Sequence, residues 1–260
     1  MTTAAQEFSD GAAYERQMGR WSRKVGVKFL DWCGVAPGQK WLDVGCGNGA
    51  FTQEIIAGAR PSQVLGIDPS PGQIEFARSR FGVSDVTLEV GNAMKLPVAD
   101  GSFDVAAMAL AISFVPSPAE AVVEMKRTVR KGGMVATYMW DFAGGGLPLK
   151  PFVDMLKTLG VEMKMPPHPE AAGRDALQTI WRAAGLNKIE TTVLHTDIAF
   201  QDFDDFWDSC SASGPPSVSL AAFSAAQRAE LKERSRAIFR TAADGSIAYR
   251  SFANAVKGLV

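Results

Sequence analysis

The stretch WLDVGCGNGAFT, residues 41–52, places three glycines at alternate positions behind a short apolar run and a single acid. The run KWLDV predicts a buried strand, and the segment after the glycines, with Phe51 and Ile55 on one face, predicts a helix. Glycine there permits a positive φ and lets a ligand approach the backbone without a Cβ in the way. Because open parallel sheets bind ligands beyond the carboxyl ends of their strands, this strand-to-helix turn is where we expect the site.

Strand and helix patterns alternate from about residue 21 to residue 200, which favours a parallel sheet covered on both faces. A first helix with apolar positions from Trp21 to Trp32 is followed by Gly34 as its C-cap. Further strands are expected at 63–68, 86–90, 103–110, 134–140 and 188–200, and helices after Ser70, from the capping box Ser117–Glu120 to Gly132, and over 177–184.

Two stretches break this alternation and predict a helical cap. Residues 142–170 are rich in Gly and Pro around one short helix, and residues 202–244 are helical, with a second capping box at Ser224 and Gln227. A final extended stretch over about 247–256 is expected to return to the sheet. We therefore predict one domain over 1–260, with a core of about 21–141, 171–200 and 245–260 and cap insertions of about 142–170 and 201–244.

Composition excludes several classes of protein. The 260 residues carry 27 basic and 28 acidic side chains, so no electrostatic footprint for nucleic acid or an anionic membrane is present. The longest apolar run, 105–115, is shorter than the roughly 20 residues of a membrane helix. No signal peptide is visible, and three widely spaced cysteines favour a reducing compartment over disulfides or a zinc site. We expect a cytoplasmic protein that acts on a small molecule, with no metal, nucleic acid or membrane partner; the oligomeric state is left open.

The glycines by themselves leave the ligand ambiguous. Gly45, Gly47 and Ala50 satisfy the dinucleotide fingerprint G-x-G-x-x-G/A, which keeps an NAD(P)-dependent oxidoreductase open as an alternative. Asp43 and Gly49 extend the pattern to D-x-G-x-G-x-G. An acid behind the loop suits a ligand with a cationic group better than a pyrophosphate.

Four segments together resemble the class I methyltransferases that use S-adenosylmethionine, of the small-molecule, ubiquinone/menaquinone-methyltransferase-like type. VGCGNG looks like the first motif of that family, and Asp68 ends the second strand as GID. The stretch GNAMKLPVADGSFD is similar to the family pattern GDAxxLPFxDxSFD, and MKRTVRKGGMV to its helix and turn before strand five. The resemblance implies a Rossmann-like, seven-stranded, mostly parallel sheet whose last strand is antiparallel, and S-adenosyl-L-methionine as cofactor.

The resemblance also implies a set of cofactor-binding residues. Asp68 is the acid that accepts hydrogen bonds from the ribose hydroxyls. Asn92 stands where the family usually has aspartate against the adenine amino group, and the next backbone N–H meets a ring nitrogen. Arg20 could pair with the methionine carboxylate and Tyr14 could cover the sulfonium. The full expected set is Tyr14, Arg20, Asp43, Gly45, Cys46, Gly47, Asp68, Pro69, Asn92, Ala93, Met94, Ala109 and Leu110.

Catalysis of methyl transfer needs little beyond positioning, because transfer is an in-line displacement on an already reactive methyl group. A general base is required only for a nucleophile that arrives protonated with a high pKa. The catalytic residue therefore stays unknown, with Trp140, Asp141 and His168 as weak candidates. Ser113 and Phe114 replace the His-His pair of many relatives, so a catalytically inactive cofactor-binding protein is a second alternative.

Three cap aromatics and one strand histidine are interpreted as structural. Phe203, Phe206 and Trp207 lie in the expected cap and favour helix packing over a substrate cage. His195 alternates with Val193 and Asp197 along its strand, opposite the more apolar Leu194 and Ile198, and is expected on a solvated or helix-covered face. The aromatics and methionines of the cap suggest a small, partly apolar acceptor.

Overall fold

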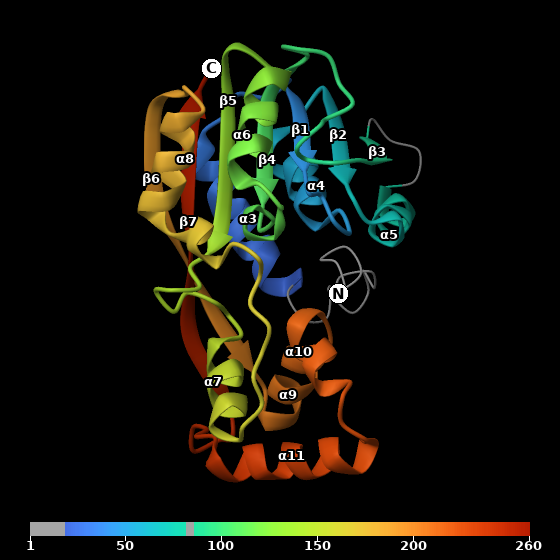
Figure 1. Cartoon of the computed structure of the whole chain (residues 1–260), viewed down its shortest axis with the longest axis vertical. Helices are drawn as coiled ribbons and strands as arrows, with labels where there is room; N and C mark the ends of the chain where they lie inside the picture. Colours follow the sequence, from blue (N-terminus) through green and yellow to red (C-terminus); the bar gives the residue numbers. More distant parts are fainter. Residues whose placement is uncertain (1–18, 82–85) are drawn as a thin grey trace.

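The computed structural model describes residues 19–81 and 86–260, apart from the side chain of Arg20. It contains one seven-stranded sheet in the order β3-β2-β1-β4-β5-β7-β6 (Figure 1). The strands are β1 (Lys40–Val44), β2 (Gln63–Asp68), β3 (Val86–Val90), β4 (Phe103–Ala109), β5 (Val129–Trp140), β6 (Asn187–Phe200) and β7 (Ile247–Leu259). Strands β1 to β5 pair in parallel, and β7 is antiparallel to both β5 and β6. The predicted Rossmann-like, mostly parallel sheet with an antiparallel last strand is confirmed.

Helices cover both faces of this sheet, and the alternation of side chains along each strand explains why. Trp41 packs with α3 (Arg20–Cys33) and α4 (Ala50–Glu54) in one apolar cluster, whereas its neighbour Leu42 belongs to a second cluster. That second cluster includes α6 (Pro118–Thr128) and α8 (Arg174–Ala183). A π-helical turn over Ile55–Ala59 continues α4, and α5 (Pro71–Phe81) packs on β2 and β3.

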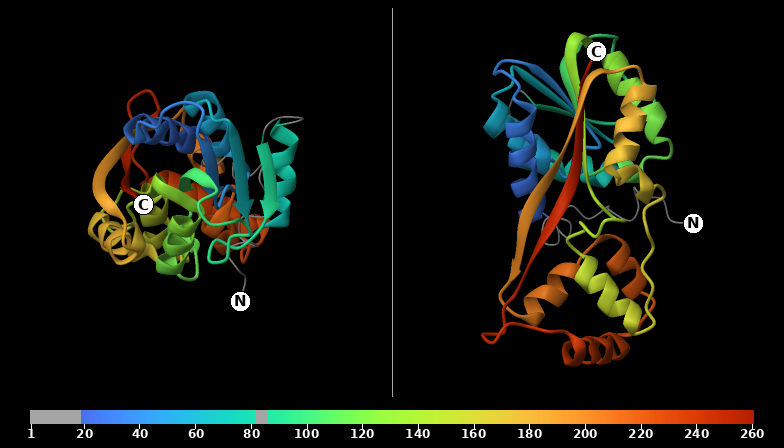
Figure 2. Two further views of the ribbon diagram at one scale, coloured as in Figure 1. Left: turned by 90° about the horizontal axis from the view of Figure 1, so that it is seen from above. Right: turned by 90° about the vertical axis from the view of Figure 1, so that its left-hand side faces the viewer.

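The cap is carried on the two longest strands. β6 and β7 continue past the layered part of the molecule and reach α7 (Lys150–Thr158), α9 (Phe203–Ser211), α10 (Gly214–Leu220) and α11 (Ala225–Ile238) (Figures 1 and 2). The ring of Phe206 lies 5.7 Å from that of Phe152 in α7 and 5.1 Å from that of Phe200 in β6. With Phe203 and Trp207 also buried, the interpretation of these cap aromatics as packing residues is confirmed. The single-domain boundaries remain a prediction.

Two local predictions around α6 were wrong. The helix ends at Thr128 instead of Gly132, and β5 begins at Val129 instead of Met134. The reason is tertiary pairing: Val129 is in register with Phe103, and the N–H of Gly132 donates to the carbonyl of Val260. These residues therefore pair in the sheet, although their sequence pattern predicts the end of a helix.

Capping and strand length also differ from expectation in places. Ser117 occupies the N-cap of α6 but its side chain makes no capping hydrogen bond, so Pro118 alone defines that start. The second capping box is formed, with Ser224 and Gln227 bonded reciprocally at the start of α11. β7 is longer than predicted because it pairs with β5 as far as Leu259.

None of the helices in the described ranges combines the length and the apolar character that crossing a bilayer demands.

Candidate functional site

The three glycines of the first turn serve different purposes. Gly45, Gly47 and Gly49 all have positive φ, at 73°, 51° and 79°. A Cβ on Gly45 would lie 2.7 Å from the Cβ of Ala111, and one on Gly49 would lie 2.7 Å from the ring of Phe81. A Cβ on Gly47 would have no atom within 4 Å, because this residue lines a large cavity that is described below. Gly45 and Gly49 thus permit close packing, and Gly47 leaves space for a ligand.

Asp68 is held in place by the same turn. One carboxylate oxygen accepts the N–H of Gly47 at 2.9 Å and the other accepts the N–H of Ser70 at 2.9 Å. Burial raises the pKa of this carboxyl above its usual value, and the two backbone donors act in the opposite direction. Each oxygen keeps a further lone pair, so a fixed acid at the cavity wall can still accept two hydroxyl hydrogen bonds.

Asp43 lies behind the turn and is completely buried. Its Oδ2 accepts the hydroxyl hydrogen of Thr52 at 2.6 Å, whereas Oδ1 has no partner among the described residues. Burial raises the pKa of Asp43 to about 7; the Thr52 hydrogen bond lowers it and the charge of Asp68 raises it further. The acid predicted from the D-x-G-x-G-x-G pattern is therefore next to the turn but outside the cavity lining.

A cavity of about 890 Å³ lies at the carboxyl ends of β1, β2, β4 and β5. This volume is near the upper end of the roughly 300–1,000 Å³ typical of small-molecule sites. Most of the predicted cofactor-binding residues contribute to its lining: Gly45, Cys46, Gly47, Asp68, Pro69, Asn92, Ala93, Met94, Ala109 and Leu110. Tyr14 and the side chain of Arg20 lie outside the described residues.

Two of these lining residues have notable backbone or side-chain geometry. Leu110 has φ of 55°, a left-handed conformation that is uncommon for a residue with a side chain, and it donates its N–H to the carbonyl of Tyr138. Asn92 is exposed at the cavity edge, and its Oδ1 accepts the N–H of Met94 at 2.9 Å. The amide oxygen that was expected to meet the adenine amino group thus already holds one backbone donor and retains one lone pair.

The far side of the cavity is formed by residues from the cap. We call this surface the cap wall; its main members are Leu147, Leu149, Val153, Met163, Met165 and Pro216. The sequence analysis singled out none of them, although the alternation of Met163 and Met165 in a Pro-rich loop was a usable signal. Ser22 of α3 and Tyr138 of β5 also line the cavity and were missed.

The three weak catalytic candidates are not brought together. Trp140 lines the cavity and is 2% exposed. Asp141 points elsewhere: its carboxylate accepts the N–H of Gly144 and the side-chain amide of Asn254. His168 has its ring nitrogens 3.1 Å from Glu170 and 3.0 Å from the carbonyl of Pro116, and it does not line the cavity.

The remaining ionisable and metal-binding candidates offer little chemistry. His195 is exposed on β6, with its ring 5.8 Å from that of Phe252, in agreement with the expected solvated face. All three cysteines are buried, and none of them forms a disulfide with another described residue. In residues 19–81 and 86–260, no three His, Cys, Asp or Glu side chains group closely enough to hold a metal ion.

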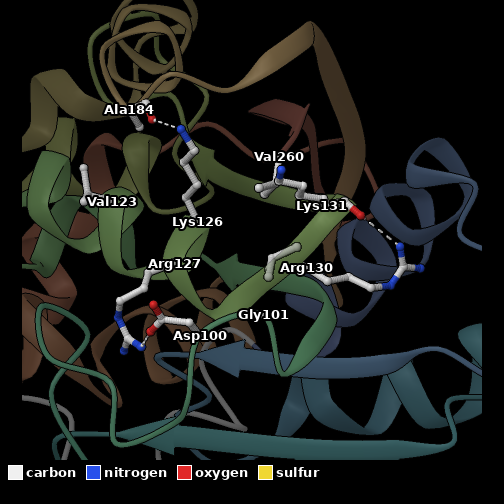
Figure 3. Close-up of a pocket in the computed structure, with 10 residues that line it drawn as sticks. Asp100, Gly101, Val123, Lys126, Arg127, Arg130, Lys131, Ala184 and Val260 are labelled. Atoms are coloured by element: carbon white, nitrogen blue, oxygen red, sulfur yellow. Dashed lines mark hydrogen bonds and ion pairs between the residues drawn. The ribbon is translucent and has the colours of Figure 1, made fainter.

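A second depression of about 520 Å³ lies at the opposite, amino-terminal end of the parallel strands (Figure 3). It contains several cations, but most are engaged: Lys126 donates to the carbonyls of Ala184 and Gly185, and Arg127 pairs with Asp100 (Figure 3). Arg127 also bonds both oxygens of Glu124. These contacts connect the loop before β4 to α6, so we interpret the cations of this depression as structural. The larger cavity, at the carboxyl ends of the strands, is therefore the candidate site.

Comparison with known proteins identifies the central part of the chain. Residues 42–137 match the protein family described as a methyltransferase domain. The O-methyltransferase cnsE of Penicillium expansum is 30% identical over 186 residues, which cover 69% of this chain and 62% of that protein. The demethylmenaquinone methyltransferase of Symbiobacterium thermophilum is 35% identical over 122 residues, covering 45% of this chain and 47% of that protein.

A solved structure has the same fold over nearly the whole chain. Phosphoethanolamine N-methyltransferase 2 of Haemonchus contortus, in complex with S-adenosyl-L-methionine, gives a TM-score of 0.61 at 19% identity. The match covers 96% of this chain and 56% of that one. Across these three relatives, the chain therefore spans between 47% and 62% of their lengths.

Proposed function

We infer that this chain, which belongs to the class I S-adenosylmethionine-dependent methyltransferases, transfers a methyl group from that cofactor to an oxygen, nitrogen or carbon nucleophile of a small molecule. The observation that carries the proposal is the single cavity that runs from the Gly47 turn and Asp68 to the apolar cap wall. Its volume leaves room for an acceptor beside a cofactor. Relatives named as an O-methyltransferase and a demethylmenaquinone methyltransferase support a small-molecule acceptor.

The residues present fit the cofactor. Gly47 offers a position that a Cβ would fill, and Asp68 offers two oriented carboxylate oxygens for ribose hydroxyls. Asn92 and the backbone of Ala93 lie at the cavity edge expected to hold adenine. When bound, S-adenosylmethionine supplies a methyl group on a sulfonium that is reactive without further activation.

The chain's own contribution is positioning and exclusion of water. Holding two reactants in line is worth roughly 7–11 kcal/mol of a reaction barrier. Among the described lining residues Asp68 is the one carboxylate and no histidine is present, and both Asp68 oxygens already accept backbone N–H groups. The proposal is therefore that the acceptor brings its own nucleophile, deprotonated or neutral, near neutral pH.

The two alternatives receive less support. An NAD(P)-dependent oxidoreductase would share the Gly45–Gly47 turn, but the methyltransferase-domain match over residues 42–137 disfavours it. A non-catalytic binding protein would bind the cofactor without turning it over. We propose that the protein works in the cytoplasm, which is supported by three buried cysteines that form no disulfide among the described residues.

The test is turnover. Purified protein is incubated with S-adenosylmethionine and a phenol, a 1,3-diketone, a thiol and a primary amine in separate reactions, and release of S-adenosylhomocysteine is measured. We expect release with at least one acceptor, and none from a Gly47→Val control whose side chain fills the cradle. Binding of the cofactor with no release from any acceptor would favour the non-catalytic alternative.

A further inference from the structure

Trp140 presents a buried hydrogen-bond donor that pairs with none of the described residues. Its side chain is 2% exposed, it lines the main cavity, and its Nε1 has no hydrogen-bond partner among the described residues. Buried indole N–H groups normally find an acceptor, as Trp181 does with the carbonyl of Val135 at 3.0 Å. An unpaired donor of this kind costs free energy until a ligand or water accepts from it.

The described neighbours of Trp140 do not accept this hydrogen bond, and their own contacts explain why. Tyr138 and Trp140 project from the same face of β5, whereas Asp141, the nearest carboxylate in sequence, is bonded to Gly144 and Asn254. The next cavity residues along the chain, Phe142 and Leu147, carry no polar side-chain atom. These described neighbours supply no acceptor, whereas a ligand in the cavity that Trp140 lines can supply one.

Trp41 provides a comparison within the same chain. Its Nε1 is likewise without a described partner, but Trp41 is 0% exposed in the core and does not line the cavity. An unpaired indole alone is therefore no sign of a ligand. What distinguishes Trp140 is that its side chain lines a cavity large enough to hold a ligand, whereas that of Trp41 does not.

We propose that Trp140 is a specificity residue for the methyl acceptor: its indole N–H donates to an oxygen of a largely apolar molecule packed against the cap wall. A carbonyl, phenolate or ether oxygen satisfies this donor, and the apolar remainder of the molecule meets Leu149, Val153 and Met163. Cationic acceptors are disfavoured, because the cap wall is mainly apolar and the charged cap residue in the same lining, Lys164, is itself a cation. This inference rests on the proposed function, since it places the acceptor in the cofactor's cavity.

The test uses two probes of matched shape, 2-acetylnaphthalene and 2-ethylnaphthalene, which differ by the ketone oxygen, with phosphoethanolamine as the charged comparison. Binding is measured by calorimetry on the protein alone and on protein saturated with S-adenosylhomocysteine. We expect the ketone to bind at least fivefold more tightly than the hydrocarbon and phosphoethanolamine not to bind. Trp140→Phe should remove the preference by weakening ketone binding alone, whereas the matched control Trp41→Phe should keep it.

A spectroscopic readout on the unmutated protein covers the case in which Trp140→Phe does not fold. Each of the six tryptophans has one indole ¹⁵N–¹H group. The signal of Trp140, assigned by substitution, should move downfield with the ketone but not with the hydrocarbon, while that of Trp41 stays fixed. A wild-type protein that fails to bind the ketone, binds both probes equally, or shows no shift at Trp140 overturns the inference. Failure of S-adenosylhomocysteine to bind would instead overturn the proposed function, and the probe comparison on the protein alone would still decide the role of Trp140.

Discussion

Replacing single glycines of the first turn by alanine distinguishes the glycines needed for close packing from the glycine needed for ligand binding. In Gly47→Ala the new Cβ would enter open cavity, with no atom within 4 Å, at a φ of 51°. A left-handed conformation costs a residue with a Cβ about 1–2 kcal/mol, and reduced freedom of the unfolded chain offsets about 0.4–1 kcal/mol of this. We therefore expect a loss of about 0–1.6 kcal/mol in unfolding free energy and a folded protein.

The matched variant Gly49→Ala should behave in the opposite way. Its φ is also positive, but the new Cβ would lie 2.7 Å from the ring of Phe81 and 3.2 Å from Ala77. Overpacking of this kind adds about 1–3 kcal/mol to the cost. At about 2–4 °C in Tm per kcal/mol for a chain of this size, the Tm of Gly49→Ala should be visibly below that of Gly47→Ala.

Thermal denaturation and calorimetry with S-adenosylhomocysteine measure the two effects separately. Gly47→Ala should keep a Tm within a few degrees of wild type yet bind at least tenfold more weakly, which is about 1.4 kcal/mol. Gly49→Ala should lose mainly stability. Wild-type affinity in Gly47→Ala would refute the assignment of that glycine to the ligand.

Three further predictions follow from single contacts. Asp68→Ala should weaken S-adenosylmethionine binding about tenfold or more in calorimetry, and unchanged affinity would remove this acid from the ribose site. Burial raises the pKa of Asp43 to about 7, so the folded chain keeps a proton there that the unfolded chain releases near pH 4. The free energy of unfolding should therefore fall as pH rises from about 4 to 7, by at most about 1.4 kcal/mol per pH unit. Urea titrations at several pH values should show a shallower fall in Asp43→Asn; an identical slope would contradict the assignment. Ser224→Ala, which breaks a formed capping box, should cost about 1 kcal/mol in urea denaturation, while Ser117→Ala, at a cap without a side-chain bond, should cost close to nothing; equal losses would count against this distinction.

The sheet was predictable because its signals are local. Glycine spacing and alternating apolar runs mark strand ends and faces, so the turn at Gly47 and the acid at the end of β2 could be placed from residues alone. The end of α6 could not, since the hydrogen bonds between Gly132–Gly133 and Val260 join segments more than a hundred residues apart.

The acceptor side of the cavity was much less predictable. Met163 and Pro216 belong to two insertions that lie far apart in the sequence, and only the folded structure shows that both line the same cavity. The sequence likewise could not show that the Trp140 N–H has no described acceptor, because this depends on which residues pack around it in the folded chain. Cap packing was easier to predict, because Phe203 is three and four residues before Phe206 and Trp207, the spacing of one helix face, and all three are buried.

The central claim is that the glycine turn and Asp68 hold S-adenosylmethionine. The most direct measurement is calorimetric titration of the purified protein with S-adenosylmethionine, S-adenosylhomocysteine and NADH in parallel. The account predicts micromolar binding of the two sulfur ligands and no heat from NADH. Binding of NADH alone would contradict it and would return the turn at residues 45–49 to the dinucleotide-binding proteins.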